Sequence, residues 1–266
     1  MSRIIGSDAA LAASAALAVA MSGLALSGYS PRSFANVELS SGASSTASAS
    51  GSTSASPSPA AKSDGKMTPL VANKAANLGV LGDSASDSTS EWVNEMGSFF
   101  GLKRSTDVRR IFQAEATGYN DPMHYGSADP ALAIWNASSE FKRDATPRMM
   151  QAIFPASPDM VLISQGRDLE ADEVPERLTA LTAALKTAHP KATLVVVLQP
   201  VGSEDPKKAS LEAVRTWAGQ QGLPTVDVAK AFAASGKGEG LQDQEGNVTA
   251  EGQISWARIV YRAISA

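Results

Sequence analysis

The sequence predicts a three-layer α/β domain in which helices cover both faces of a parallel sheet. From about residue 76 onward, short apolar segments alternate with segments of helical periodicity. The segments 159–164 and 192–198 are apolar throughout their interiors, as expected for strands that are buried on both faces. Because strand–helix–strand crossovers are right-handed and bring successive strands parallel, this order predicts a sheet between two layers of helices.

Strands are predicted where short apolar segments lie between turn-forming residues. In chain order the predicted strands are 77–81, 108–114, 131–135, 159–164, 192–198 and 225–228. The segment 118–130 is rich in Gly, Asn, Asp and Pro, and is predicted to be a loop.

Helices are predicted where apolar residues recur at helical spacing behind a capping residue. The first follows Ser88–Glu91, and the second starts at Thr146–Pro147. The others are predicted over 170–188, 206–222 and 249–265, with Thr249 as a cap. Pro175 is compatible with the third helix only in its first turn.

The chain before this domain divides into two segments. Residues 1–38 resemble a secretory signal peptide, with a positive start at Arg3, an Ala/Leu-rich stretch and a small-x-small pattern at Ala25–Ser27. The alternative is an N-terminal tail without a targeting role, and a stable membrane span beyond such a signal or anchor is not expected. Residues 39–69 are rich in Ser, Ala and Pro and predict a flexible linker. With the folded domain at 70–266, this layout is typical of a secreted or cell-surface bacterial protein.

Composition excludes several kinds of site and partner. The net charge is −4 without a long basic run, so nucleic acid is not an expected partner. The chain has no cysteine, which excludes disulfides, thiolate chemistry and zinc–cysteine sites. Its two histidines, His124 and His189, lack carboxylates at ligand spacing, so no metal is predicted. Since no Gly-rich phosphate loop follows the first strand, no nucleotide or other cofactor is expected.

The most informative residue is Ser84, which follows the first predicted strand in the sequence Gly82-Asp83-Ser84. Ligand sites of parallel sheets lie at the carboxyl ends of the strands, where 166–168 and the loop 236–248 are also expected. A serine there has the position of a nucleophile, although a turn serine that caps the next segment is the alternative. His124 is the candidate substitute base, since its loop follows the second strand. His189 is expected to interact only with the end of a helix.

Three segments resemble, in order, the conserved blocks of the SGNH (GDSL) hydrolases. They are Leu81–Ser84, Ile163–Leu169 and Glu245–Gly252. The resemblance implies a flavodoxin-like three-layer α/β/α sandwich with a central parallel sheet. It also implies a serine esterase or acyl hydrolase in which Ser84 is the nucleophile.

The resemblance is lost at the other catalytic positions. Asp168 replaces the family asparagine of the oxyanion hole, and Asn247 replaces the catalytic histidine. The acid paired with that histidine corresponds to Gln244, with Asp243 beside it, and the family glycine is missing from 136–141. A serine without an imidazole is a weak nucleophile, and an ionised Asp168 would repel the developing oxyanion.

Two classes of function follow from this pattern. The first is an exported esterase or acyl hydrolase that uses Ser84 on a small-molecule or polymer ester, with weakened partners. The second is a catalytically inactive domain that binds a cell-envelope ligand or a partner, which the missing histidine, asparagine and glycine favour. Structural roles are the alternative for two of the replacements: Asp168 as a helix N-cap and Asn247 as a loop residue before Thr249.

Overall fold

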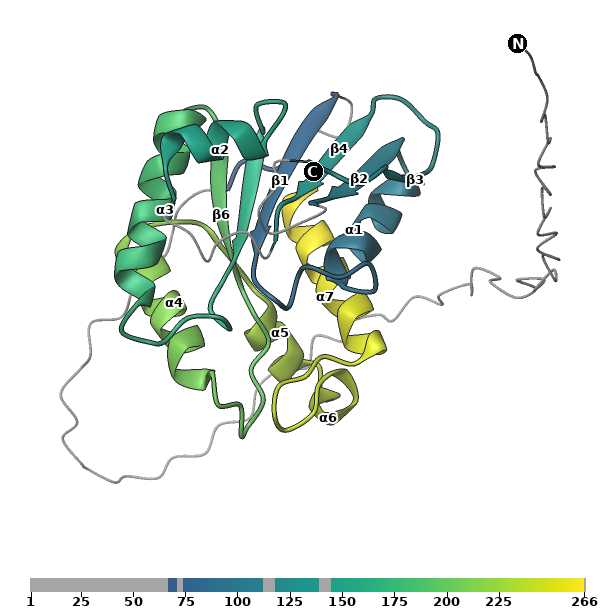
Figure 1. Cartoon of the computed structure of the whole chain (residues 1–266). Coiled ribbons are helices and arrows are strands. Elements are labelled where there is room, and N and C mark those ends of the chain that lie inside the picture. The colour runs from purple at the N-terminus through teal and green to yellow at the C-terminus, as the bar shows by residue number, and fades with distance from the viewer. Residues whose placement is uncertain (1–66, 71–73, 112–117, 139–144, 266) are drawn as a thin grey trace, which may run out of the picture. The chain divides into compact units, whose positions relative to one another are not determined.

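The computed structural model describes residues 67–70, 74–111, 118–138 and 145–265, which all belong to the compact unit Ser56–Ala266. Its strands are β1 (Ala76–Gly82), β2 (Thr106–Arg110), β3 (Met123–Tyr125), β4 (Leu132–Asn136), β5 (Met160–Ser164), β6 (Thr193–Leu198) and β7 (Thr225–Asp227). They form a seven-stranded sheet in the order β3-β2-β4-β1-β5-β6-β7 within this part of the chain (Figure 1). Every neighbouring pair is parallel except β2 and β3.

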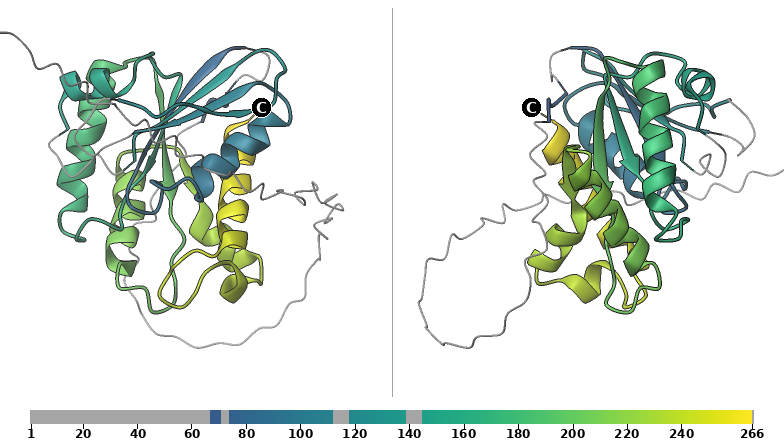
Figure 2. Two further views of the ribbon diagram at one scale, coloured as in Figure 1. Left: turned by 45° about the vertical axis from the view of Figure 1, so that its right-hand side comes forward. Right: turned by 90° about the vertical axis from the view of Figure 1, so that its left-hand side faces the viewer.

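The helices are α1 (Trp92–Gly101), α2 (Pro147–Ile153), α3 (Val174–Ala188), α4 (Lys208–Gln220), α5 (Val228–Ala234), α6 (Gly238–Leu241) and α7 (Ala250–Ile264). Side chains of α1, α5 and α7 pack on one face of the sheet, and those of α2, α3 and α4 pack on the other (Figure 2). The predicted three-layer α/β/α fold is therefore confirmed.

Strand β5 shows how the sheet supports both layers. Leu162 packs with the α1, α5 and α7 side, whereas Val161 and Ile163 pack with the α2, α3 and α4 side. All three side chains are fully buried. Alternate residues of one strand point to opposite faces, so an uninterrupted apolar run serves both cores at once.

The central strands have the flavodoxin-like order. Across the sheet these strands lie in the order β4-β1-β5-β6-β7. If the five strands are numbered along the chain, this is the order 2-1-3-4-5. β2 and β3 extend the sheet beyond β4. The order reverses between β1 and β5, which are direct neighbours. In such sheets the crevice for a ligand opens beyond the carboxyl ends of these two strands.

Local capping explains where several helices begin. Thr146 accepts a hydrogen bond from the Met149 amide at the start of α2, and Thr249 accepts one from the Gly252 amide at the start of α7. Both caps agree with the prediction. Helix α3 begins at Val174, later than the predicted residue 170, and Pro175 lies in its first turn as required.

Three elements were not predicted. β3 lies within 118–130, which was expected to be only a loop; its three residues, next to Pro122 and Gly126, are too few to show strand periodicity. α6 lies in the predicted loop 236–248. α5 begins directly after β7, because the Asp227 side chain accepts the Lys230 amide hydrogen and caps the helix.

The predicted N-terminal signal segment and most of the linker lie outside the described residues, as do residues 112–114 of the second predicted strand. Leu70, the first residue of the predicted domain, is buried and forms a bridge with Ser265, and Met67 of the predicted linker also packs against the core. No helix in the described part of the chain is both long and apolar enough to cross a membrane.

Candidate functional site

Ser84 and Asp168 lie together where the strand order reverses. Ser84 follows the end of β1 and Asp168 follows the end of β5, whose register pairs Gly82 with Ser164. The Ser84 hydroxyl donates to Asp168 Oδ1 at 2.7 Å, and the Ser84 backbone N–H donates to Asp168 Oδ2 at 3.1 Å. Both residues are exposed. The expected position of Ser84 at the edge of the sheet is therefore confirmed. The carboxylate of Asp168 accepts both hydrogen bonds that Ser84 can donate.

The turn that carries Ser84 is fixed by the buried carboxylate of Asp83. This carboxylate accepts hydrogen bonds from the backbone N–H groups of Arg167 (2.8 Å) and Ala85 (3.2 Å), and from Gln199 Nε2 (3.0 Å). Burial raises the pKa of Asp83, although these donors oppose the shift. The negative charge of Asp168 raises it further.

A second buried cluster supports the turn from the β4 side. The Asn136 Nδ2 group donates to the Ser86 carbonyl oxygen at 2.8 Å, and Asn136 Oδ1 accepts the Ser138 amide hydrogen at 3.1 Å. Ser138 Oγ in turn accepts the Gly82 amide hydrogen at 3.1 Å. Since a Cβ on Gly82 would collide with both Ser86 and Ser138, only glycine fits at the end of β1.

The expectation that the His124 loop opens beside Ser84 is wrong. His124 lies on β3, which runs antiparallel to β2. In this pairing His124 is opposite Asp107 of β2. Its Nδ1 is 2.6 Å from Asp107 Oδ1, and its side chain is 70% exposed. Asp107 is level with Asn77 near the start of β1, so at about 3.3 Å per residue His124 lies on the order of 20 Å from Ser84 along the strands. The return of the chain along β3 removes the candidate base from the site.

His189 is at the end of α3, as predicted, and its amide donates to the Leu185 carbonyl oxygen. Its ring is buried, with Nε2 3.0 Å from the Met150 carbonyl oxygen and an edge-to-face contact with Phe154. Since the chain has only these two histidines, no imidazole contacts Ser84.

In the last block, Asn247 at the histidine position contacts Asp243, the neighbour of Gln244. Asp243 accepts hydrogen bonds from the Asn247 amide at 2.8 Å and from Asn247 Nδ2 at 2.9 Å. These two bonds lower the pKa of Asp243. Gly246 has a φ of +86°, which lets the loop turn back on itself. We call residues 242–247 the Asp243 loop.

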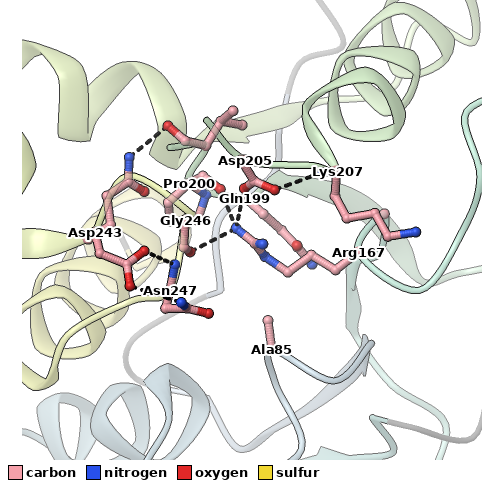
Figure 3. A network of polar contacts seen from close by, with 12 residues as sticks. Ala85, Arg167, Gln199, Pro200, Asp205, Lys207, Asp243, Gly246 and Asn247 are labelled. Carbon is pink, nitrogen blue, oxygen red and sulfur yellow. Dashed lines mark hydrogen bonds and ion pairs between the residues drawn. The ribbon is translucent and has the colours of Figure 1, made fainter. Parts of the chain in front are cut away.

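The Arg167 side chain reaches the Asp243 loop at Gly246 (Figure 3). Nη2 of Arg167 donates to the Gly246 carbonyl oxygen at 3.0 Å and pairs with Asp205 at 3.0 Å. The contacts of Arg167 and Asp83 thus hold the loops on both sides of residue 167 in place.

The role of Asp168 as an N-cap is not what the structure shows, because α3 begins at Val174. Asn247 precedes the Thr249 cap, as its structural alternative states, and is exposed. Sequence reasoning missed Gln199, which joins Asp83 to the end of β6. Its signal was a polar residue immediately after the buried strand 193–198, where parallel strands present their functional side chains.

The described residues show no group of three or more His, Asp and Glu side chains that could hold a metal ion.

The segment 136–141, where the family glycine is missing from the sequence, is described only in part, because residues 139–141 lie outside the described residues. At Asn136, Ala137 and Ser138 the second block offers buried residues, and the Asn136 side chain is committed to the cluster beneath the turn. The arrangement thus presents a serine hydroxyl hydrogen-bonded to a carboxylate, with no imidazole beside it.

No family model matches the chain, and no curated protein matches it. Among solved structures, it is similar to a lipase/acylhydrolase from Enterococcus faecalis, with 14% identity over 71% of this chain and 95% of that one and a TM-score of 0.49. It is also similar to the psychrotrophic esterase EstA from Pseudoalteromonas sp., with 16% identity, 71% and 96% coverage and a TM-score of 0.47. A further similar structure is a GDSL-like lipase from Parabacteroides merdae, with 12% identity, 71% and 95% coverage and a TM-score of 0.46.

The α/β/α fold with a flavodoxin-like order of the central strands is shown by the chain's own strand pairings. At identities of 12–16%, we take the chemistry of this chain from the geometry of its site.

Proposed function

We propose that the domain is a non-hydrolytic relative of SGNH-type esterases that binds a hydroxyl-bearing ligand at the carboxyl ends of β1 and β5. One observation carries the proposal: Asp168 accepts both the hydroxyl and the backbone N–H of Ser84. In ester hydrolysis the Ser84 hydroxyl would have to attack the ester carbonyl carbon, and the Ser84 backbone N–H would have to stabilise the oxyanion.

Elementary chemistry opposes hydrolysis at this site. A carboxylate is a much weaker base than an imidazole and is a poor acceptor for a serine proton at neutral pH. The same carboxylate places negative charge where the oxyanion would form. Loss of a single oxyanion donor costs on the order of 3 kcal/mol, and here the donor is replaced by a charge that repels the oxyanion.

The exposed groups define which ligand fits. Asp168 offers carboxylate oxygens, and Asn247 and Asp243 offer further oxygens from the opposite loop. These acceptors suit the hydroxyl donors of a saccharide or polyol better than they suit an anion. A cell-envelope glycan or its uncleaved ester is therefore the ligand class that we favour.

Activity and binding are tested on the same purified chain. We expect neither labelling by a fluorophosphonate probe nor turnover of p-nitrophenyl acetate from about pH 5 to 9, as in Ser84→Ala. Neutral oligosaccharides, such as chito- and cello-trimers, should shift the amide resonances of Ser84 and Asn247, and Asp168→Ala should remove these shifts. Labelling that disappears in Ser84→Ala would refute the non-hydrolytic proposal, and unchanged resonances would refute the saccharide class.

A second candidate is an acid-active serine hydrolase with Asp168 as its base. The 2.7 Å contact between exposed Ser84 Oγ and Asp168 Oδ1 favours it, because this is the geometry of a nucleophile and its proton acceptor. This candidate predicts labelling that requires both side chains and is lost in Asp168→Asn. The same labelling series separates the two functions.

Export remains part of the proposal. The signal-like residues 1–38 and the linker 39–69 support a domain that is tethered outside the bacterial cytoplasm and meets envelope ligands there. A fusion of residues 1–69 to a reporter that is active only after export should be active. The reporter should lose activity when the Ala/Leu-rich stretch is interrupted by charged residues.

A further inference from the structure

The side chain of Arg167 joins three segments of the chain. Its Nη2 group donates to the carbonyl oxygens of Pro200 at 2.9 Å and Gly246 at 3.0 Å, and it pairs with Asp205 Oδ2 at 3.0 Å (Figure 3). The side chain of Arg167 is 15% exposed and that of Asp205 is 0% exposed. Since the pair is shielded from water, removal of one partner leaves the other poorly compensated.

The two loops that Arg167 contacts are also joined to each other. The Glu204 amide donates to the Gln244 carbonyl oxygen at 2.9 Å, and Gln242 Nε2 donates to the Val201 carbonyl oxygen at 2.7 Å. Gly202 lies so close to the Asp243 loop that a Cβ on it would collide with the loop's backbone. The segment 200–205 and the Asp243 loop are therefore joined as one unit.

On its other side, Arg167 belongs to the segment that holds Ser84. Its backbone N–H donates to Asp83 at 2.8 Å, and the next residue, Asp168, accepts both donors of Ser84. Arg167 and Asp168 are adjacent, and the first contacts the Asp243 loop whereas the second contacts Ser84. We infer that Arg167 is a positioning residue, which fixes the Asp243 loop and its Asn247 relative to Ser84.

Arg167 should order the Asp243 loop whether the site binds a ligand or cleaves it. Its failure is therefore distinguishable from failure of the proposed function. Hydrogen exchange of the full chain tests it through the Gly246 and Asn247 amides, which donate to Asp243. In Arg167→Met, these amides should exchange at least about tenfold faster, because the bonds that hold the loop in place are lost.

The Ser84 amide and the strand amides of β5 should keep their protection in Arg167→Met, since the backbone bond of residue 167 to Asp83 persists. Arg167→Lys should restore part of the loop protection, because an ammonium can reach Asp205 but cannot serve all three acceptors. The matched control is Arg215→Met, which removes an arginine of α4 that is paired with Asp227. This change should leave the exchange of the loop amides unchanged.

Two results would overturn the inference. One is unchanged exchange of the Gly246 and Asn247 amides in folded Arg167→Met. The other is acceleration spread evenly over β5, β6 and the loop, which indicates general destabilisation. If Arg167→Met does not fold, the double variant Arg167→Met/Asp205→Asn removes the unpaired buried charge, and it is compared with Asp205→Asn alone. The loop amides must still exchange about tenfold faster in the double variant.

Discussion

Ser84 and Asp168 approach each other from adjacent parallel strands, and the carboxylate of Asp168 receives both hydrogens that Ser84 can donate. The SGNH pattern that the sequence blocks resemble has a neutral amide at this position. An ionised carboxylate there would repel an oxyanion that such an amide would stabilise.

Introducing the residues of the SGNH pattern that the sequence blocks resemble should therefore create esterase activity. In Asp168→Asn/Gln244→Asp/Asn247→His, Ser84 gains a neutral oxyanion donor and a paired imidazole. We expect p-nitrophenyl acetate turnover to rise about 100-fold or more above that of the parent chain, since a general base alone contributes this much. The added Ser84→Ala change should abolish the gain. Turnover that stays at the parent level would show that these positions do not converge on Ser84.

Asp83 should keep its proton to a higher pH than an ordinary aspartate, whose value is 3.8, because burial raises its pKa. A group whose pKa is higher in the folded state stabilises the fold most below its unfolded pKa. Its contribution is then lost as the pH rises through the folded pKa. Carbon-13 shifts of the Asp83 carboxyl, followed over a pH titration, should report a midpoint above 3.8. A midpoint below 3.8 would contradict the prediction.

Asn136 should be needed for stability, because its buried amide satisfies both the Ser86 carbonyl and the Ser138 amide. Asn136→Ala leaves these buried groups without partners, so the free energy of unfolding should fall by about 2 to 3 kcal/mol. Urea denaturation should show a lower midpoint with an unchanged slope. The control Asn120→Ala, at a partly exposed position, should change stability by less than about 0.5 kcal/mol. Equal effects of the two variants would refute the role of Asn136.

Gly79 in β1 faces the ring of Phe154, and a Cβ at residue 79 would lie 2.7 Å from two ring atoms. Gly79→Ala should therefore destabilise the domain by about 1 to 3 kcal/mol through overpacking. Phe154→Leu should cost less in the Gly79→Ala background than in the parent, because the smaller side chain relieves the collision. The control Gly118→Ala meets open space and should be nearly neutral. Additive effects of the changes at 79 and 154 would contradict this packing.

The sequence was sufficient for features that depend on neighbouring residues. The continuous apolar segments at 159–164 and 192–198 require burial on both faces, and this requirement identified the sheet and its two helical layers. Thr146 and Thr249 cap helices through bonds that span only three residues, so their positions were readable locally. The place of Ser84 at the carboxyl edge followed from the rule for parallel strands.

The sequence could not place side chains whose partners are distant in the chain. His124 follows β2 as expected, but β3 turns back antiparallel and carries it to the other end of the sheet. Asp168 was interpreted equally as a helix cap, because its partner Ser84 is 84 residues away. Only tertiary structure brings these groups within hydrogen-bond distance. Local chemistry thus determines the elements and the edge at which a site forms, whereas strand order and direction decide which side chains meet there.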